Sequence, residues 1–211
     1  MPLSIYNSAS GKKEIFKPQN PPQVKLYVCG ITTYDEAHLG HARAAVVFDV
    51  VFRVLKHLGY QVHYVRNYTD IDDKILKRAA ENQEPWKALA ERYVLAYAQV
   101  MDQLKVLKPT EEPRATDYID SMQALIKILE EKNLAYAQGG DVFFAVRKFP
   151  TYGELAKKKL EDLEAGARVE LREEKRDPLD FALWKKAKPG EPFWPSPGVK
   201  VGLVGILNVP L

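Results

Sequence analysis

The sequence contains a single cysteine, Cys29, among its 211 residues. One thiol excludes a disulfide within the chain, so no covalent cross-link supports the fold. Sparse cysteine is typical of proteins in reducing compartments, and we therefore expect a cytoplasmic location.

Long apolar runs are also lacking. The most apolar interior stretch, residues 44–55, is broken by Asp49 and Arg53 and is too short to span a bilayer. The N-terminal sixteen residues have no long apolar core of the kind that secretory signals carry. The sequence also shows no repeat and no low-complexity tract. We expect no membrane partner.

A strong excess of either charge is missing too. The chain has 31 lysines and arginines against 28 aspartates and glutamates, a net charge of +3. Such a small excess permits contact with nucleic acid without indicating it. The hydrophobic share of 46% and the charged share of 28% are ordinary for a globular protein. At this length we expect one large domain, or one domain with an insertion.

The clearest pattern present is one strand–helix–strand unit. Residues 24–29, "VKLYVC", form a β-branched and aromatic run, and residues 61–66, "QVHYVR", form another. Between them, residues 41–58 repeat apolar side chains with helical spacing and stop before Gly59, a residue type common just past a helix. A helical crossover of this length joins parallel strands, so we predict a parallel pair.

The remaining elements are read from periodicity and turn residues. Helices are predicted over 85–107 and 116–132, and a hairpin is predicted around "QGG" at 138–140. A short strand is predicted in "DPLDFALWK", and 188–197 is proline-rich and extended. The helix-capping candidates after the second strand are Thr69, Asp70 and Asp72.

A candidate site lies where the first strand ends. In an open parallel sheet, ligands bind beyond the carboxyl ends of the strands, and Cys29 and Gly30 stand there. The following helix start favours phosphate, and His38 and His41 can donate to phosphate oxygens. Gly40 lacks a side chain, which leaves room for a flat ring.

Other interpretations of these residues stay open. A cysteine at a strand end is more often a small buried hydrophobe than a ligand. The histidine pair also admits metal binding, although histidine ligands on one helix more often sit four residues apart.

The motifs together resemble the cysteinyl-tRNA synthetase family of class I aminoacyl-tRNA synthetases. "YVCGITTYDEAHLGHAR" is similar to that family's nucleotide-binding signature, and "RNYTDIDDKI" is similar to its second block. Further blocks follow in the family's order up to Pro197: "RATDYIDSMQALI", "GDVFF", "YGELA", "GARVE", "KRDPLDFALWK" and "GEPFWPSP".

The resemblance implies a reaction and its partners. The family activates cysteine with ATP, carried with magnesium, to cysteinyl-adenylate, and then transfers the cysteine to the 3′ end of its tRNA. It is a ligase of protein biosynthesis, and its full-length members are expected to be monomers. Zinc gives it specificity, because a soft thiolate is a better zinc ligand than a hydroxyl.

The resemblance also assigns roles to residues of this sequence. The two histidines, His38 and His41, would stabilise the phosphates in the transition state. Cys29 would be the first zinc ligand. The nucleotide and cysteine pockets would be formed by Thr33, His38, Gly40 and His41 and by Gly30 and Thr69, respectively.

The implied fold is α/β. Residues 1–110 would be the first half of a Rossmann-like, nucleotide-binding parallel sheet. Residues 111–197 would be an α+β insertion. Residues 198–211 would be a tail outside the family pattern.

The tail departs from the family after Pro197. The family continues with a segment similar to "WGKGRPGWHIECSAM", which carries a pocket tryptophan and a second zinc cysteine, whereas this chain has "GVKVGLVGILNVPL". One possible coding of that tail, read with a single added T, gives "WGKGRPGWHIECSA" in the neighbouring frame. We therefore expect residues 198–211 to be out of frame. A genuine apolar strand is the alternative.

The expected consequence is a chain that lacks activity by itself, because Cys29 would be its only zinc ligand. Two alternative functions are a cysteine ligase of mycothiol synthesis, whose acceptor is an amino sugar, and a non-catalytic nucleotide- or RNA-binding fragment. Arg43 and the block "RNYTDIDDK" favour the tRNA enzyme.

Overall fold

The computed structural model describes residues 2–158, 160, 175–196 and 199–204. Contacts between Cα atoms divide the chain into two compact units, one built from residues 17–119 and the other from residues 1–16 and 120–207. This division rests on contacts alone and assigns no function to either unit. The domains expected at 1–110, 111–197 and 198–211 therefore stay a prediction.

The first unit contains the expected crossover. Strand β3 (Gln23–Thr32), helix α1 (Leu39–His57) and strand β4 (Gln61–Thr69) follow one another, and β3 pairs with β4 in parallel. The α/β fold and the parallel pairing are therefore confirmed. Both strands run further than predicted, because their ladder continues through Ile31↔Tyr68 and Thr32↔Thr69.

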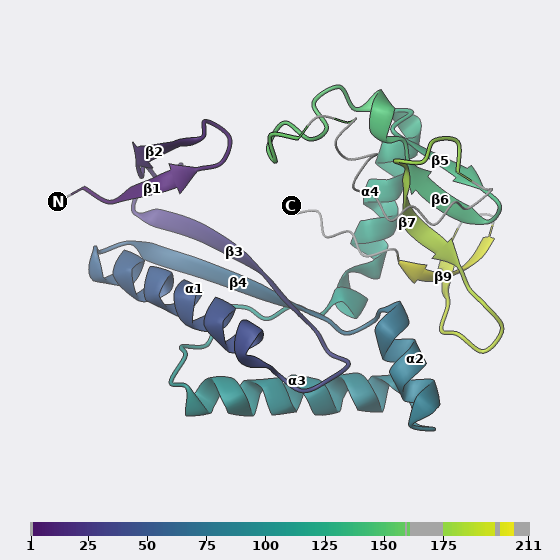
Figure 1. Ribbon diagram of the computed structural model, residues 1–211, viewed down its shortest axis with the longest axis horizontal. Coiled ribbons are helices and arrows are strands. Elements are labelled where there is room, and N and C mark those ends of the chain that lie inside the picture. The colour runs from purple at the N-terminus through teal and green to yellow at the C-terminus, as the bar shows by residue number, and fades with distance from the viewer. Residues whose placement is uncertain (1, 159, 161–174, 197–198, 205–211) are drawn as a thin grey trace. The chain divides into compact units, whose positions relative to one another are not determined.

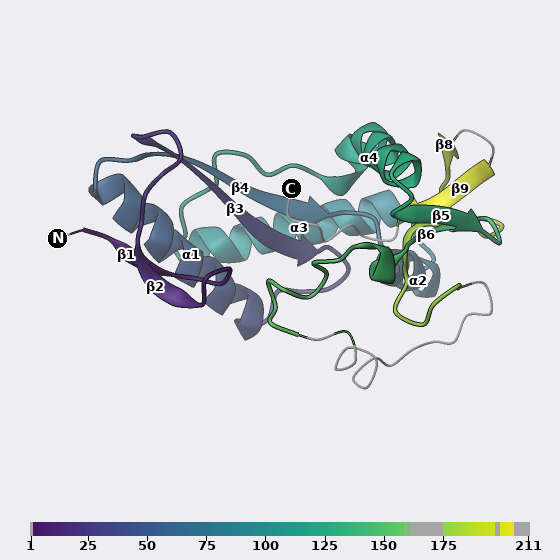
Figure 2. The same ribbon diagram turned by 90° about the horizontal axis from the view of Figure 1, so that it is seen from above.

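Two helices cover one face of this strand pair. Val28 and Tyr64 of the strands pack with Phe52 of α1. Nearer the carboxyl ends, Ile31 and Tyr68 pack with α1 and with helix α3 (Trp86–Gln103). Figures 1 and 2 show both helices running alongside β3 and β4. The opposite face of β3, which carries Tyr27 and Cys29, is exposed.

A further segment runs along the other edge of β4. Isolated parallel bridges join Val65 to Glu111 and Tyr68 to Arg114. The Tyr68 N–H donates to the carbonyl of Pro113 at 2.8 Å. The buried Arg66 of β4 pairs with Glu112 of this segment, with 2.9 Å between Nη2 and Oε1. Burial and then the Glu112 charge raise the pKa of the adjoining Tyr68.

Helix α2 (Asp73–Glu81) follows β4, and Asp72 is its N-cap, as predicted, accepting from the Lys74 N–H at 2.8 Å. Asp70 does not cap this helix. Its carboxylate accepts from the backbone N–H of Thr116 at 3.0 Å and from the Thr116 hydroxyl at 2.6 Å.

Helix α3 ends earlier than predicted, because Lys105 adopts a φ of 58°. Within the described ranges, no helix combines the length and apolarity that a membrane span needs.

The second unit is α+β. The predicted hairpin around Gly139 and Gly140 is confirmed, and both glycines have positive φ, 64° and 94°, as a two-residue hairpin turn favours. Its core packs Tyr136, Phe143 and Ala145. The elements of this unit are β1 (Ser4–Asn7), β2 (Lys12–Ile15), α4 (Ile119–Glu131), β5 (Ala135–Gln138), β6 (Asp141–Phe144), β7 (Phe181–Lys186), β8 (Trp194–Ser196) and β9 (Val199–Val204).

The sheet of this unit has the order β5-β6-β7-β9-β8, with antiparallel neighbours throughout. Strands β1 and β2 form a separate antiparallel pair that the sequence analysis did not predict. Strand β9 belongs to the predicted tail and agrees with the apolar-strand alternative. The reading-frame hypothesis stays a prediction, and residues 205–211 lie outside the described part of the chain.

Candidate functional site

A bulge interrupts β3 at Cys29 and Gly30. The register with β4 shifts between Val28 and Ile31. As a result, the buried positions of β3 change phase, from Val24 and Val28 before the shift to Ile31 after it. Cys29 stays exposed. The thiol therefore does not lie in the packed interior, and the interpretation of Cys29 as a buried hydrophobe is wrong.

Gly30 is required by a close approach of two backbones. A Cβ at this position would lie 1.6 Å from the carbonyl oxygen of Asn67. Any side chain would force the strands apart. The glycine at the predicted amino-acid pocket thus has a backbone reason of its own.

Asn67 holds the bulge together. Its Oδ1 accepts from the Gly30 N–H at 2.8 Å and from the Tyr27 hydroxyl at 3.1 Å. Its Nδ2 lies 3.4 Å from the Thr69 hydroxyl and donates to it. Asn67 was not predicted as a site residue. It follows the strand predicted at 61–66, and its partner Gly30 lies 37 positions away, so no local sequence signal indicated it.

Thr33 and Thr69 join the loop to the end of β4. Thr33 is fully buried. Its N–H and its hydroxyl both donate to the Thr69 carbonyl, at 3.1 and 3.3 Å. The Thr33 hydroxyl therefore has a structural partner, and a contact of Thr33 with nucleotide stays a prediction.

The two histidines meet at the start of α1. His38 is the N-cap, and its Nδ1 accepts from the Gly40 N–H at 3.0 Å. His41 Nδ1 accepts from the His38 N–H at 3.3 Å. The rings stack with their centroids 3.8 Å apart. A Cβ on Gly40 would lie 2.8 Å from His38 Cε1, so this glycine makes room for the capping ring.

This geometry sets the position of the ring protons. A neutral imidazole that accepts at Nδ1 carries its proton on Nε2. Both rings therefore present an Nε2–H donor beside the first turn of α1, which has no acidic residue. Burial, and then the neighbouring His38, lower the pKa of His41. Such a pair of neutral donors is suited to an anionic group such as a phosphate.

The loop between β3 and α1 is anchored to α2. Arg78 Nη2 pairs with Asp35 Oδ2 at 2.8 Å. Lys74 Nζ lies 5.3 Å from the ring centroid of Tyr34, which packs against the cluster that contains Ile75. Residues of α2, which are distant in the chain, thus hold the loop between β3 and α1 in place.

The predicted site residues fall into two groups. Cys29, Gly30 and Thr69 are joined through Asn67, and His38, Gly40 and His41 are joined by the helix cap. Loop 33–38 connects the two groups. Within the described part of the chain, no three His, Cys, Asp or Glu side chains gather as a metal site would require. Cys29 therefore does not form a zinc site with other described residues.

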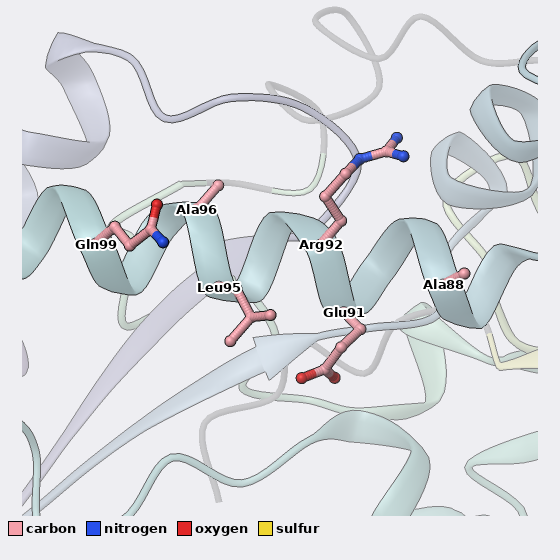
Figure 3. A pocket seen from close by; sticks show the side chains of 6 residues that line it. All are labelled: Ala88, Glu91, Arg92, Leu95, Ala96 and Gln99. Atoms are coloured by element: carbon pink, nitrogen blue, oxygen red, sulfur yellow. The ribbon is translucent and has the colours of Figure 1, made fainter.

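A shallow hollow of about 490 Å³ lies along α3 and contains no predicted site residue. Its two charged residues are engaged elsewhere, since Glu91 pairs with Arg114 and Arg92 pairs with Glu84. Figure 3 shows Glu91 and Leu95 projecting from one side of α3 and Arg92 from the other. The lining residues are Ala88, Glu91, Arg92, Leu95, Ala96 and Gln99.

Comparison with known proteins covers most of the chain. Residues 15–202 match the family described as tRNA synthetases class I (C) catalytic domain. The chain is 58% identical over 196 residues to the cysteine–tRNA ligase of Thioalkalivibrio sulfidiphilus, covering 92% of this chain and 43% of that protein. It is 56% identical over 198 residues to the one of Stutzerimonas stutzeri, covering 93% and 43%. The chain thus spans about two fifths of the length of these relatives.

A solved structure shows the same fold at low identity. It is a LeuRS–tRNA–LeuAMS ternary complex from Agrobacterium radiobacter K84, with a TM-score of 0.53 and 18% identity, covering 71% of this chain and 23% of that chain.

Proposed function

We propose, from the premise that this chain belongs to the class I (C) tRNA synthetase catalytic-domain family, that it forms the nucleotide- and cysteine-binding part of a cysteine–tRNA ligase. The observation that carries the proposal is the identity of 58% to a cysteine–tRNA ligase over 92% of the chain. The helix cap made by His38 and His41 supports it from the geometry.

The first reaction is the activation of cysteine. A carboxylate oxygen of cysteine attacks the α-phosphorus of ATP, the bond from that phosphorus to the pyrophosphate oxygen breaks, and cysteinyl-adenylate and pyrophosphate form. Negative charge builds up on the phosphate oxygens. The Nε2–H groups of His38 and His41 would donate to these oxygens, and such donors act most strongly when they are oriented in advance. The backbone amides that occupy Nδ1 of each ring supply that orientation.

In the second reaction a hydroxyl at the 3′ end of tRNA attacks the carbonyl carbon of cysteinyl-adenylate, the bond from that carbon to the phosphate oxygen breaks, and cysteinyl-tRNA and AMP form. We propose cysteine, ATP and the tRNA for cysteine as partners. Magnesium is proposed as the ion carried with ATP. The described residues do not fit a zinc site by themselves, and no reaction step is assigned to zinc. Cys29 is proposed as the thiolate that this segment would contribute to such a site.

A chimera tests the proposed function. Residues 1–197 of this chain would replace the aligned segment of the Thioalkalivibrio sulfidiphilus ligase, a substitution that 58% identity makes practicable. Cysteine-dependent exchange between ATP and pyrophosphate is then measured. We expect exchange by the chimera, none by the 211-residue chain alone, and charging of tRNA in preference to an amino sugar.

The matched variant is His38→Asn. Asparagine is a good N-cap, so the start of α1 is retained while the Nε2–H donor is lost. We expect exchange to fall about 100-fold, the usual cost of one transition-state donor, with little change in melting temperature. An inactive but folded chimera, or full activity of His38→Asn, would refute the proposal. Turnover by the chain alone would refute its expected inactivity.

A further inference from the structure

We propose that Asn67 is a positioning residue for the amino-acid site, and that it holds the bulge through which Cys29 faces outward while Ile31 is buried. The proposal rests on the proposed function for the meaning of the site. The geometry behind it does not depend on catalysis.

The side-chain amide of Asn67 has a single workable orientation. Both acceptor positions of Oδ1 are occupied, by the Gly30 N–H and the Tyr27 O–H. Rotating the amide by half a turn would place its NH₂ group against the Gly30 N–H, which can only donate. Nδ2 is therefore directed toward the Thr69 hydroxyl. One side chain thus ties the residue after Cys29 to a predicted residue of the cysteine pocket.

The bulge allows Cys29 and Ile31 to lie on opposite faces of the strand. In an unbroken strand, side chains alternate between the two faces, and a shift of one residue turns each side chain over. Val28 and Ile31 are both buried, whereas Cys29 is exposed. An unbroken ladder would put positions 29 and 31 on one face, so either Cys29 would turn toward the helices or Ile31 would turn away from them. The extra residue at Cys29–Gly30 prevents this, as bulges do where a side chain is re-aimed.

Asn67 supplies the partner that the bulge needs. A bulge leaves a backbone N–H outside the ladder, and here the Asn67 side chain accepts that of Gly30. The backbone carbonyl of Asn67 also excludes any side chain at position 30. The same residue therefore stabilises the bulge with its side chain and fixes the residue type beside Cys29 with its backbone.

Hydrogen exchange and thiol alkylation of the 211-residue chain test the proposal. Cys29 is the only cysteine, so alkylation by iodoacetamide at a fixed alkaline pH reports on this thiol alone. In Asn67→Ala we expect exchange of the Gly30 amide to rise about fivefold, as the loss of one ordinary hydrogen bond predicts. We expect the rate of alkylation of Cys29 to change, because the bulge that orients position 29 is no longer held. Neighbouring ladder amides should keep their protection.

Two further variants separate positioning from general stability. Asn67→Asp keeps the acceptor, so the Gly30 amide should stay protected and Cys29 should stay exposed. Asn82→Ala is the matched control, since Asn82 is an exposed amide that bonds Glu84, and it should change neither rate. Tyr27→Phe removes one of the two donors to Oδ1 and should raise Gly30 exchange by less than Asn67→Ala. It also covers the case in which Asn67→Ala does not fold.

Unchanged Gly30 exchange in Asn67→Ala overturns the proposal, or in Tyr27→Phe if Asn67→Ala does not fold. The proposal is equally overturned by alkylation rates of Asn67→Ala and wild type that agree within experimental error, or by a uniform loss of protection along β3. None of these measurements uses ATP or tRNA, so a failed ligase assay leaves them interpretable.

Discussion

Two histidine rings cap α1 where serine, threonine, aspartate or asparagine caps most helices. Because each ring accepts a backbone N–H through Nδ1, protonation of either ring removes one of the two capping bonds. The cap and the proposed phosphate donors thus share one protonation state, with Nδ1 unprotonated and Nε2 protonated.

The stability of the chain should therefore depend on pH through His41. Its pKa in the folded chain lies below its ordinary value of 6.5, so the unfolded chain binds the proton more readily. This contribution is full above 6.5 and is lost as the pH falls through the lower, folded-state pKa. Melting temperatures measured across this range should fall on acidification, and they should fall less in His41→Asn. His57→Asn, at the other end of α1, serves as the control. An identical pH dependence in wild type and His41→Asn would contradict this assignment.

Sequence reasoning found the histidines but not their capping role. Histidine is rarely a cap residue, so the pattern placed the helix start at His41 instead of after His38. Asn67 was missed for a different reason. Its partner Gly30 lies 37 positions away, and no local pattern reports a contact of that range.

Helix α1 is apolar on two opposite sides. Phe52 and Leu55 are buried against the strands, with 6% and 4% of their surfaces exposed. The outer side carries further apolar residues that are 37–53% exposed: Val46, Val47, Val50, Val51, Val54 and Leu58. Apolar residues on two opposite sides are more typical of a helix that is packed on both sides than of a surface helix.

Changing the outer side of α1 should alter association without altering stability. In Val50→Lys, at a site 53% exposed, we expect the free energy of unfolding to stay within about 0.5 kcal/mol of wild type. Concentration-dependent association should decrease, because an apolar patch is interrupted. Sedimentation velocity and urea titration measure the two effects. In Phe52→Ala, which lies on the buried side, we expect a loss of about 3 kcal/mol. Equal losses in the two variants would show that the outer side is packed.

Elements with strong periodicity were predicted well and their ends less well. The crossover of β3, α1 and β4 followed from the spacing of apolar residues. The end of β3 did not, because Gly30 indicates a loop, whereas Asn67 keeps that residue within the strand. Strands β1 and β2 are short and exposed, so they carry little of the apolar alternation that reveals a strand.

The two compact units have separate cores. Leu89 lies in a cluster of the unit formed by residues 17–119, and Phe143 lies in a cluster of the other, and each side chain is 0% exposed. Each of these clusters lies within one unit, so each core should respond to mutation on its own.

Calorimetry of the chain should therefore resolve two transitions. Phe143→Ala should lower one melting temperature and Leu89→Ala the other, each with a loss of about 3 kcal/mol for a large buried side chain. Near-ultraviolet circular dichroism assigns the transitions, because the buried Trp184 belongs to the unit of Phe143. A single transition that moves equally in both variants would contradict independent cores.

The segment alongside β4 makes lateral growth of the parallel sheet one-sided. β4 is already flanked by β3 and by residues 110–116, and Pro113 has no N–H to donate to a further strand. Among the described strands, β3 has β4 as its only ladder neighbour. Within the described part of the chain, a further strand could therefore pair only along the second edge of β3. That strand would lie next to the bulge, so strand addition and access to Cys29 would both depend on this edge of the sheet.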